Sequence, residues 1–240
     1  MPTPELGAAG LSAGQGRSIG DLDILVPREA LDAVEAALIA AGWEWVKPDP
    51  YDDAYYRRWM HELPPLVHRD RDRLIDVHHT ILPPTARLTP DAAAILAGAE
   101  VLGNGLAVPS QADLVVHAAL HLFADGDLSG GLRNLWDIDR LLREFADEDP
   151  DFWLRLHARA AEHGASAVMA RAARLAHDLF ATPVPDAWAR LLRHDLAFRR
   201  RLLARDDWGR VDRAATRLAF YVRSHWIRMP PPLLARHLAI

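Results

Sequence analysis

The stretch Gly20-Asp21-Leu22-Asp23-Ile24-Leu25-Val26 places two carboxylates one residue apart at the start of an apolar run. Side chains alternate between the faces of a strand, so Asp21 and Asp23 would share one face and the apolar residues would enter the core. The residues predicted to face the core are Leu22, Ile24 and Val26. Adjacent acids repel, and a divalent cation with oxygen ligands is their usual partner. Two exposed acids at the start of a strand are the alternative interpretation.

A third acid lies in Arg73-Leu74-Ile75-Asp76-Val77-His78-His79-Thr80-Ile81, which alternates like a second strand. One predicted face carries Ile75, Val77 and His79, and the other carries Leu74, Asp76 and His78. A carboxylate within such a strand costs several kcal/mol of desolvation unless it is paired or bound to metal. If the two strands are neighbours, Asp76 could accept a proton or complete the shell of a second ion. An ion pair with Arg73 or Arg71 is the alternative.

A glycine-rich segment precedes the first two acids. Between Leu6-Gly7-Ala8 and Asp21 come Gly10, Gly14, Gly16, Arg17 and Ser18. Glycine lets backbone amides approach a phosphate closely, and the guanidinium group of Arg17 matches phosphate oxygens. A disordered terminus is the alternative interpretation of this segment.

Together these motifs resemble the polymerase-beta-like nucleotidyltransferase superfamily. Its pattern is an apolar residue, Gly and a small residue, then Asp-x-Asp between apolar residues, and a third Asp on a later strand. The matching positions are Leu6-Gly7-Ala8, Asp21-Leu22-Asp23 and Asp76. A bacterial subgroup of small, uncharacterised nucleotidyltransferases is similar in more detail, with matches at Arg17, residues 21–26, Gly42-Trp43, residues 74–78 and the helical segment 117–142.

The resemblance implies an α+β fold, in which residues 1–106 form a nucleotidyltransferase-like mixed β-sheet with flanking helices. Residues 107–240 would form an all-α helical domain. The implied activity is transfer of a nucleotidyl group from an NTP to an unknown hydroxyl-bearing acceptor, with two Mg²⁺ or Mn²⁺ ions. The metal ligands would be Asp21, Asp23 and Asp76, and the triphosphate would be held by Gly7, Ala8, Arg17 and Ser18.

The chain departs from the family pattern at its N-terminus. Family members usually have Lys-Gly-Ala or Gly-Gly/Ser followed by a helix, whereas here Gly7 follows Leu6 and leads into a short, glycine-rich segment. This departure motivates an alternative function. The chain would then be a catalytically inactive, nucleotide- or partner-binding member of the family, antitoxin-like or regulatory.

Composition is that of an ordinary globular protein. The chain has 240 residues, half of them hydrophobic, which suffices for one large or two modest cores. It has no apolar run of membrane-spanning length and no signal-peptide pattern, so we expect a cytoplasmic protein. The absence of cysteine excludes disulfides, thiolate catalysis and Cys-based zinc sites. The formal net charge of −5 argues against a broad nucleic-acid surface.

Turn and helix signals divide the first half of the chain. Pro27 and Gly42 bracket a predicted amphipathic helix over residues 28–41. Residues 48–58 are predicted to form a loop that leads into a strand at about residues 56–63, although stacking of the loop tyrosines on a base is an alternative. His61-Glu62 is not the zinc-protease motif, because Pro64 and Pro65 break any helix. A further helix is predicted to start at Thr89-Pro90-Asp91, and Gly103-Asn104-Gly105 marks a turn.

From Ser110 onward the pattern is helical. Further helices are predicted over residues 132–145, 151–163, 165–180, 186–204 and 211–227. His117 and His121 share one helix face and could ligate a metal, but no third ligand is evident, so we interpret His121 as a packed or substrate-facing residue. Arg133 and Asp137 are predicted to form a salt bridge, with a role toward substrate as the alternative.

Overall fold

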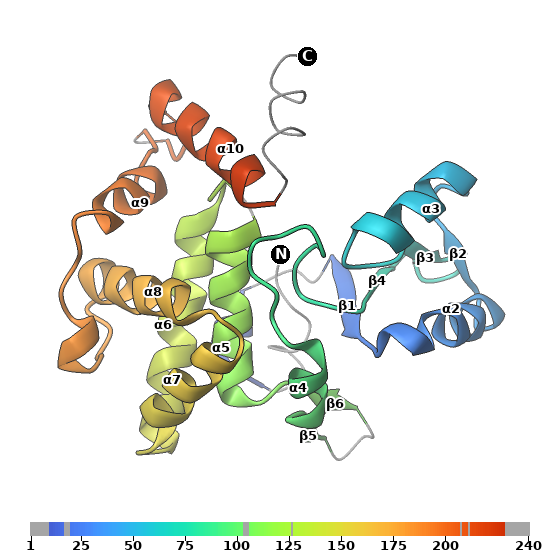
Figure 1. Ribbon diagram of the computed structural model, residues 1–240, viewed down its shortest axis with the longest axis horizontal. Coiled ribbons are helices and arrows are strands. Elements are labelled where there is room, and N and C mark those ends of the chain that lie inside the picture. The colour runs from blue at the N-terminus through green and yellow to red at the C-terminus, as the bar shows by residue number, and fades with distance from the viewer. Residues whose placement is uncertain are drawn as a thin grey trace. The chain divides into compact units, whose positions relative to one another are not determined.

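A computed structural model describes residues 10–16, 20–102, 106–125, 127–206, 208–210 and 212–228. The chain forms two compact units, residues 1–84 with 90–110 and residues 85–89 with 111–240. The fold is α+β, with a four-stranded mixed sheet and flanking helices followed by a helical C-terminal region (Figure 1). The predicted fold class is confirmed, whereas the predicted boundary at residues 106 and 107 stays a prediction.

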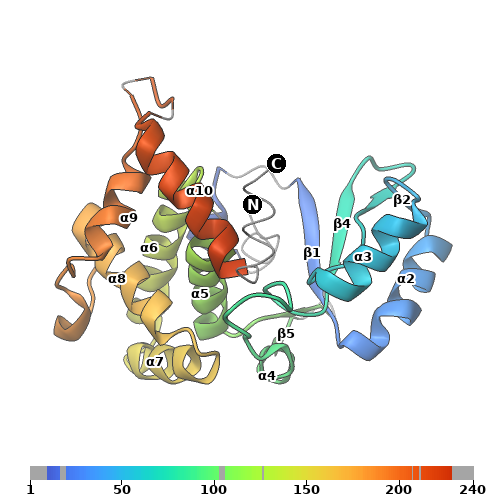
Figure 2. The same cartoon turned by 45° about the horizontal axis from the view of Figure 1, so that its top comes forward.

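The sheet of the first unit has the strand order β1-β4-β3-β2. Its strands are β1 Asp21–Leu25, β2 Trp43–Trp45, β3 Leu66–His68 and β4 Leu74–His78. β1 runs parallel to β4, and the other neighbouring pairs are antiparallel. Figure 2 shows β1 and β4 side by side, and in their register Asp23 lies opposite Asp76. The two sequence stretches that carry the acids are therefore neighbouring strands.

The helix α2 (Leu31–Ala40) packs on one face of this sheet and follows a 3-10 turn at Arg28–Ala30. Together the turn and the helix span nearly the same residues as the helix predicted over residues 28–41. The buried core residues are Leu31, Leu63, Leu66, Ile75 and Val77, and Ile24, Val26, Val34, Leu38 and Trp43 pack against them. The prediction for Leu22 was wrong. Its side chain is 40% exposed, because β1 lies at the edge of the sheet and, among the described strands, has a neighbour on one side only.

The predicted loop and strand over residues 48–63 are wrong, because Pro50–Trp59 forms the helix α3. The Asp49 side chain caps this helix by accepting a hydrogen bond from the backbone N–H of Tyr51 at 2.8 Å, and Pro50 occupies the first turn. Arg57 then forms ion pairs with Asp53 one turn earlier and with Glu35 of α2, at 2.8 and 2.6 Å. Local capping and these charges outweigh the strand preference of the tyrosines.

The first unit also contains α4 (Ala92–Ala97), which begins where a helix start was predicted and is capped by Asp91. A two-stranded sheet of β5 (Glu100–Val101) and β6 (Ala107–Val108) follows. The turn predicted at residues 103–105 lies outside the described residues. Within the described part of the chain, no helix combines the length and hydropathy that crossing a membrane requires.

The second unit is built from helices, of which α5 packs against α6, α7 and α8. Its helices are α5 Gln111–Leu120, a π-helical turn His121–Asp125, α6 Gly131–Glu148, α7 Phe152–Glu162, α8 Ser166–Phe180, a 3-10 turn Asp186–Trp188, α9 Asp195–Leu202 and α10 Ala214–Arg228. The single helix predicted over residues 186–204 is therefore interrupted. The fully buried carboxylate of Asp195 accepts a hydrogen bond from the backbone N–H of Leu192 and pairs with Arg174. These two contacts fix Asp195 as the first residue of a new helix, α9.

Candidate metal centre

Three carboxylates converge on the β1–β4 pair, and we call Asp21, Asp23 and Asp76 the carboxylate cluster. One oxygen from each lies within 4.8 Å of one oxygen from each of the others. Asp21 is buried, and Asp23 and Asp76 are half-buried. Their position follows from the strand period, since Ile75 and Val77 point into the core and Asp76 between them must point away from it.

The electrostatics of the cluster disfavour three negative charges in one place. Burial, together with the charges of Asp23 and Asp21, raises the pKa of Asp76 from 3.8 to about 6, while the His78 imidazole acts in the opposite direction. Carboxylate oxygens are the ligands that Mg²⁺ and Mn²⁺ prefer, and a divalent cation would relieve this repulsion. The spacing also suits ions about 3.5–4 Å apart, as in two-metal sites. The residues present therefore fit such ions.

A second group of side chains lies beside the carboxylate cluster. The Nε2 atom of His78 is 3.5 Å from an oxygen of Asp23 and 3.5 Å from an oxygen of Glu62, and the His61 Nε2 is 3.8 Å from the same Glu62 oxygen. Burial works against the charged imidazole, but the carboxylates of Asp23, Glu62 and Asp76 raise the pKa of His78 above its ordinary value. In the metal-free protein, the carboxylates therefore favour the charged form of the His78 imidazole relative to a free histidine.

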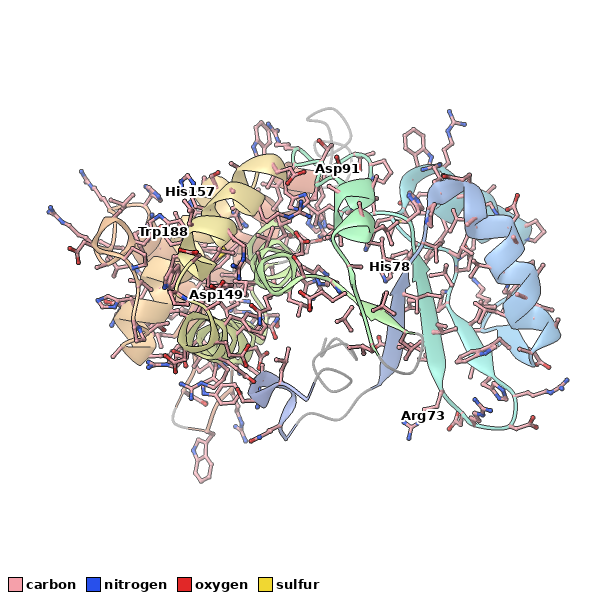
Figure 3. The ribbon with its side chains drawn as sticks, turned by 90° about the horizontal axis from the view of Figure 1, so that it is seen from below. Arg73, His78, Asp91, Asp149, His157 and Trp188 are labelled. Carbon is pink, nitrogen blue, oxygen red and sulfur yellow. The ribbon has the colours of Figure 1, made fainter. Side chains whose placement is uncertain are left out.

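Backbone pairing fixes this second group. Glu62 forms an isolated antiparallel bridge with His78, and Leu63 N–H donates to the carbonyl of Val77 at 2.9 Å. The backbone N–H of His79 donates to the carbonyl of His61, also at 2.9 Å. Figure 3 labels His78, the last residue of β4, and Arg73, the residue that precedes this strand. The His61-Glu62 dipeptide, which fits no helical zinc motif, thus joins the site through a strand-like pairing.

Comparison with known proteins identifies the family. A family model described as an uncharacterised nucleotidyltransferase matches residues 6–181. The chain belongs to this family. No curated protein and no solved structure matches it. The predicted membership in the nucleotidyltransferase superfamily is therefore confirmed, and the match reaches from the glycine-rich segment to the end of α8.

The remaining predicted site residues of this nucleotidyltransferase fall into two groups. Gly7, Ala8, Arg17 and Ser18 lie outside the described residues. His121, Arg133 and Asp137 belong to the second unit, whereas the carboxylate cluster is built by the first unit alone.

His121, Arg133 and Asp137 each contact neighbouring side chains within the second unit. His121 opens the π-helical turn, a feature frequent at functional sites, and its ring centroid is 6.4 Å from that of His117. The Nε atom of Arg133 is 3.1 Å from an Asp137 oxygen, so the predicted salt bridge is present. Arg133 also lies over the ring of Trp136 and lines a pocket of about 530 Å³ with Arg205. Roles of these residues toward a substrate stay predictions.

Sequence reasoning missed Glu62 as a member of the site and did not assign a role to His78. The signal for His78 was present, since it lies two residues after Asp76 and therefore on the same face of β4. Glu62 could not be found in this way, because its pairing with His78 depends on a contact between segments 16 residues apart, beyond the reach of local periodicity.

Proposed function

We propose that this nucleotidyltransferase moves a nucleotidyl group from an NTP to a hydroxyl-bearing acceptor, with two Mg²⁺ or Mn²⁺ ions held by the carboxylate cluster. One observation carries the proposal. Asp21 and Asp23 on β1 and Asp76 on the adjacent parallel strand bring oxygens within 4.8 Å of one another, on the sheet face away from the core. This donor set and spacing suit two hard cations that share a substrate phosphate.

In the proposed reaction, the acceptor oxygen attacks the α-phosphorus and forms a new phosphorus–oxygen bond. The bond between the α-phosphorus and the oxygen that bridges to the β-phosphate breaks, and pyrophosphate leaves with the electron pair. The cations, when bound, neutralise the charge on the transferring phosphate. Asp76 either accepts the hydroxyl proton or completes the coordination of one ion. In the metal-free protein, burial and the charges of Asp23 and Asp21 raise the pKa of Asp76 to about 6, so this carboxylate takes up a proton more readily than an exposed aspartate, as the first role requires.

The other predicted contacts complete this proposal. Gly7, Ala8, Arg17 and Ser18 would steady the triphosphate, as the family resemblance implies. His121, Arg133 and Asp137 would face the acceptor. We also propose a cytoplasmic location, where NTPs are available, and we assign no broad nucleic-acid surface to the protein.

The proposal is tested with α-labelled NTPs, Mg²⁺ and a metabolite extract as the source of acceptors. Asp21→Ala should abolish the transfer of label, because it removes a metal ligand on which phosphate positioning depends. Asp70→Ala is the matched control, since its carboxylate lies in the same unit and is 74% exposed. Equal transfer by wild type and Asp21→Ala would refute the proposal. Nucleotide binding without any labelled adduct would support the catalytically inactive alternative.

A further inference from the structure

We propose that His61, Glu62 and His78 form a separate cation site for a borderline divalent ion of the zinc class. We call these three residues the imidazole cluster. One ligand atom from each lies within 4.8 Å of the ligand atoms of the other two. The inference does not rest on the proposed transfer reaction, because it concerns a different donor set.

The distances within the imidazole cluster approach those of a zinc site. Zinc bonds of about 2.0–2.2 Å in a tetrahedron separate neighbouring ligand atoms by about 3.3–3.6 Å. The Glu62 oxygen is 3.5 Å from Nε2 of His78 and 3.8 Å from Nε2 of His61. Two of the three edges therefore need little change. The remaining edge, between a ring nitrogen of His61 and one of His78, is at most 4.8 Å long.

The donor types distinguish this site from the carboxylate cluster. Mg²⁺ and Ca²⁺ take oxygen ligands, whereas two imidazole nitrogens with one carboxylate suit Zn²⁺ and Co²⁺. Two histidines and a glutamate that leave a fourth position open are also a donor set found in catalytic zinc sites. The Asp23 oxygen, 3.5 Å from Nε2 of His78, lies where it could fill the fourth position and link the two clusters.

The site is both held in place and open to an ion. The backbone bonds from Leu63 to Val77 and from His79 to His61 fix the two segments that carry the ligands, which limits the entropy lost on binding. The side chains of His61, Glu62 and His78 are 15, 21 and 18% exposed, so an ion can reach them without local unfolding. In a helical zinc motif, the second histidine would follow His61-Glu62 on the same helix. Here the second histidine is His78, which lies on β4.

The test is a calorimetric titration of the chelator-treated full-length protein with Zn²⁺ in excess Mg²⁺, which keeps the carboxylate cluster saturated. We expect one equivalent of Zn²⁺ to bind the wild type. His61→Ala and Glu62→Gln should each weaken this binding more than about tenfold. Loss of a residue that only supports a metal ligand already costs about that much, so loss of a ligand should cost more. Co²⁺ should give the intense visible bands of a four-coordinate site in wild type and lose them in both variants.

Two control variants locate the ion. His157→Ala removes an exposed imidazole of α7, which stacks on Trp188 at 6.2 Å between centroids (Figure 3), and should leave Zn²⁺ affinity unchanged. Asp76→Asn should weaken the response to Mg²⁺ and retain the Zn²⁺ site.

Three results would overturn the inference. They are no stoichiometric Zn²⁺ binding by wild type, an equal loss in His157→Ala, or a loss in Asp76→Asn without one in Glu62→Gln. Should His61→Ala fail to fold, Glu62→Gln and the wild-type titration decide. If the zinc site is refuted, His78 is an ion-pair partner of Glu62 and Asp23 only. The result of the nucleotidyl-transfer assay does not depend on this outcome.

Discussion

Replacing Asp76 with asparagine should stabilise the metal-free protein, and the gain should grow as the pH rises. The carboxyl group of Asp76 has its pKa raised from 3.8 to about 6, first by burial and then by the charges of Asp23 and Asp21. Below about pH 3.8, Asp76 is protonated in both the folded and the unfolded chain and carries no penalty. Between the two values the folded chain binds more protons, so stability falls with rising pH, and above about pH 6 the whole penalty applies.

The size of this penalty follows from the same two values. The difference between 3.8 and about 6 corresponds to about 3 kcal/mol at 1.36 kcal/mol per pKa unit. Asp76 is only half-buried, so solvent screening reduces the expected penalty to about 1–2 kcal/mol. Asparagine has nearly the same shape and does not ionise. The variant should therefore match wild type at about pH 4 and exceed it by about 1–2 kcal/mol at about pH 7.5.

Urea unfolding in the presence of a chelator measures this difference, with wild type and variant compared at both pH values. Asp70→Asn is the control, because it makes the same substitution in the same unit at a side chain that is 74% exposed. A gain of the same size at both pH values would refute the electrostatic explanation. So would an Asp76→Asn protein that is less stable than wild type at the higher pH.

Two further results are expected. Mg²⁺ at a hundred times its dissociation constant should raise the free energy of unfolding by about 2.7 kcal/mol. Asp23→Asn should weaken that response, and identical melting of wild type and variant with and without Mg²⁺ would make these carboxylates ordinary surface groups. His121→Ala should raise the KM for the acceptor far more than the KM for the NTP, because His121 is predicted to face the acceptor. Steady-state kinetics check this, and equal rises in both constants would contradict it.

The sequence was informative where a local period determines direction. Alternation alone indicates that Asp76 shares a face with His78 and opposes Ile75 and Val77, as the structure has it. The same holds for most helices of the second unit, whose apolar periods and turn residues predict α6, α7 and α8 to within a few residues.

The sequence misled where two local signals competed. Around Pro50–Trp59, aromatic residues favour a strand, while the Asp49 cap and Pro50 favour a helix. The ion pairs of Arg57 with Asp53 and Glu35 add to the stability of the helix. The interruption before α9 was missed, although Asp195 in the first turn, which accepts a hydrogen bond from the backbone N–H of Leu192, is a local sign of a helix start. It also depends on the pairing of Asp195 with Arg174 of α8, a contact between separate helices that local sequence does not reveal.

Long-range pairing limits what could be predicted of the site. The acids of β1 and β4 converge only because these strands are parallel neighbours with Asp23 opposite Asp76. From the sequence, the convergence of the three acids follows only if the two strands are neighbours, and local periodicity does not determine which strands pair. Glu62 lies beside the carboxylate cluster because its backbone forms a bridge with His78, and no sequence motif predicts this bridge.

A crystal structure with Mn²⁺ and a non-hydrolysable NTP analogue would test the central claim most directly. Anomalous density should show two Mn²⁺ ions about 3.5–4 Å apart, bound by Asp21, Asp23 and Asp76, with the α-phosphate in contact with them. Ions bound elsewhere, or a nucleotide whose α-phosphate lies away from these three carboxylates, would contradict the proposed two-metal nucleotidyl transfer.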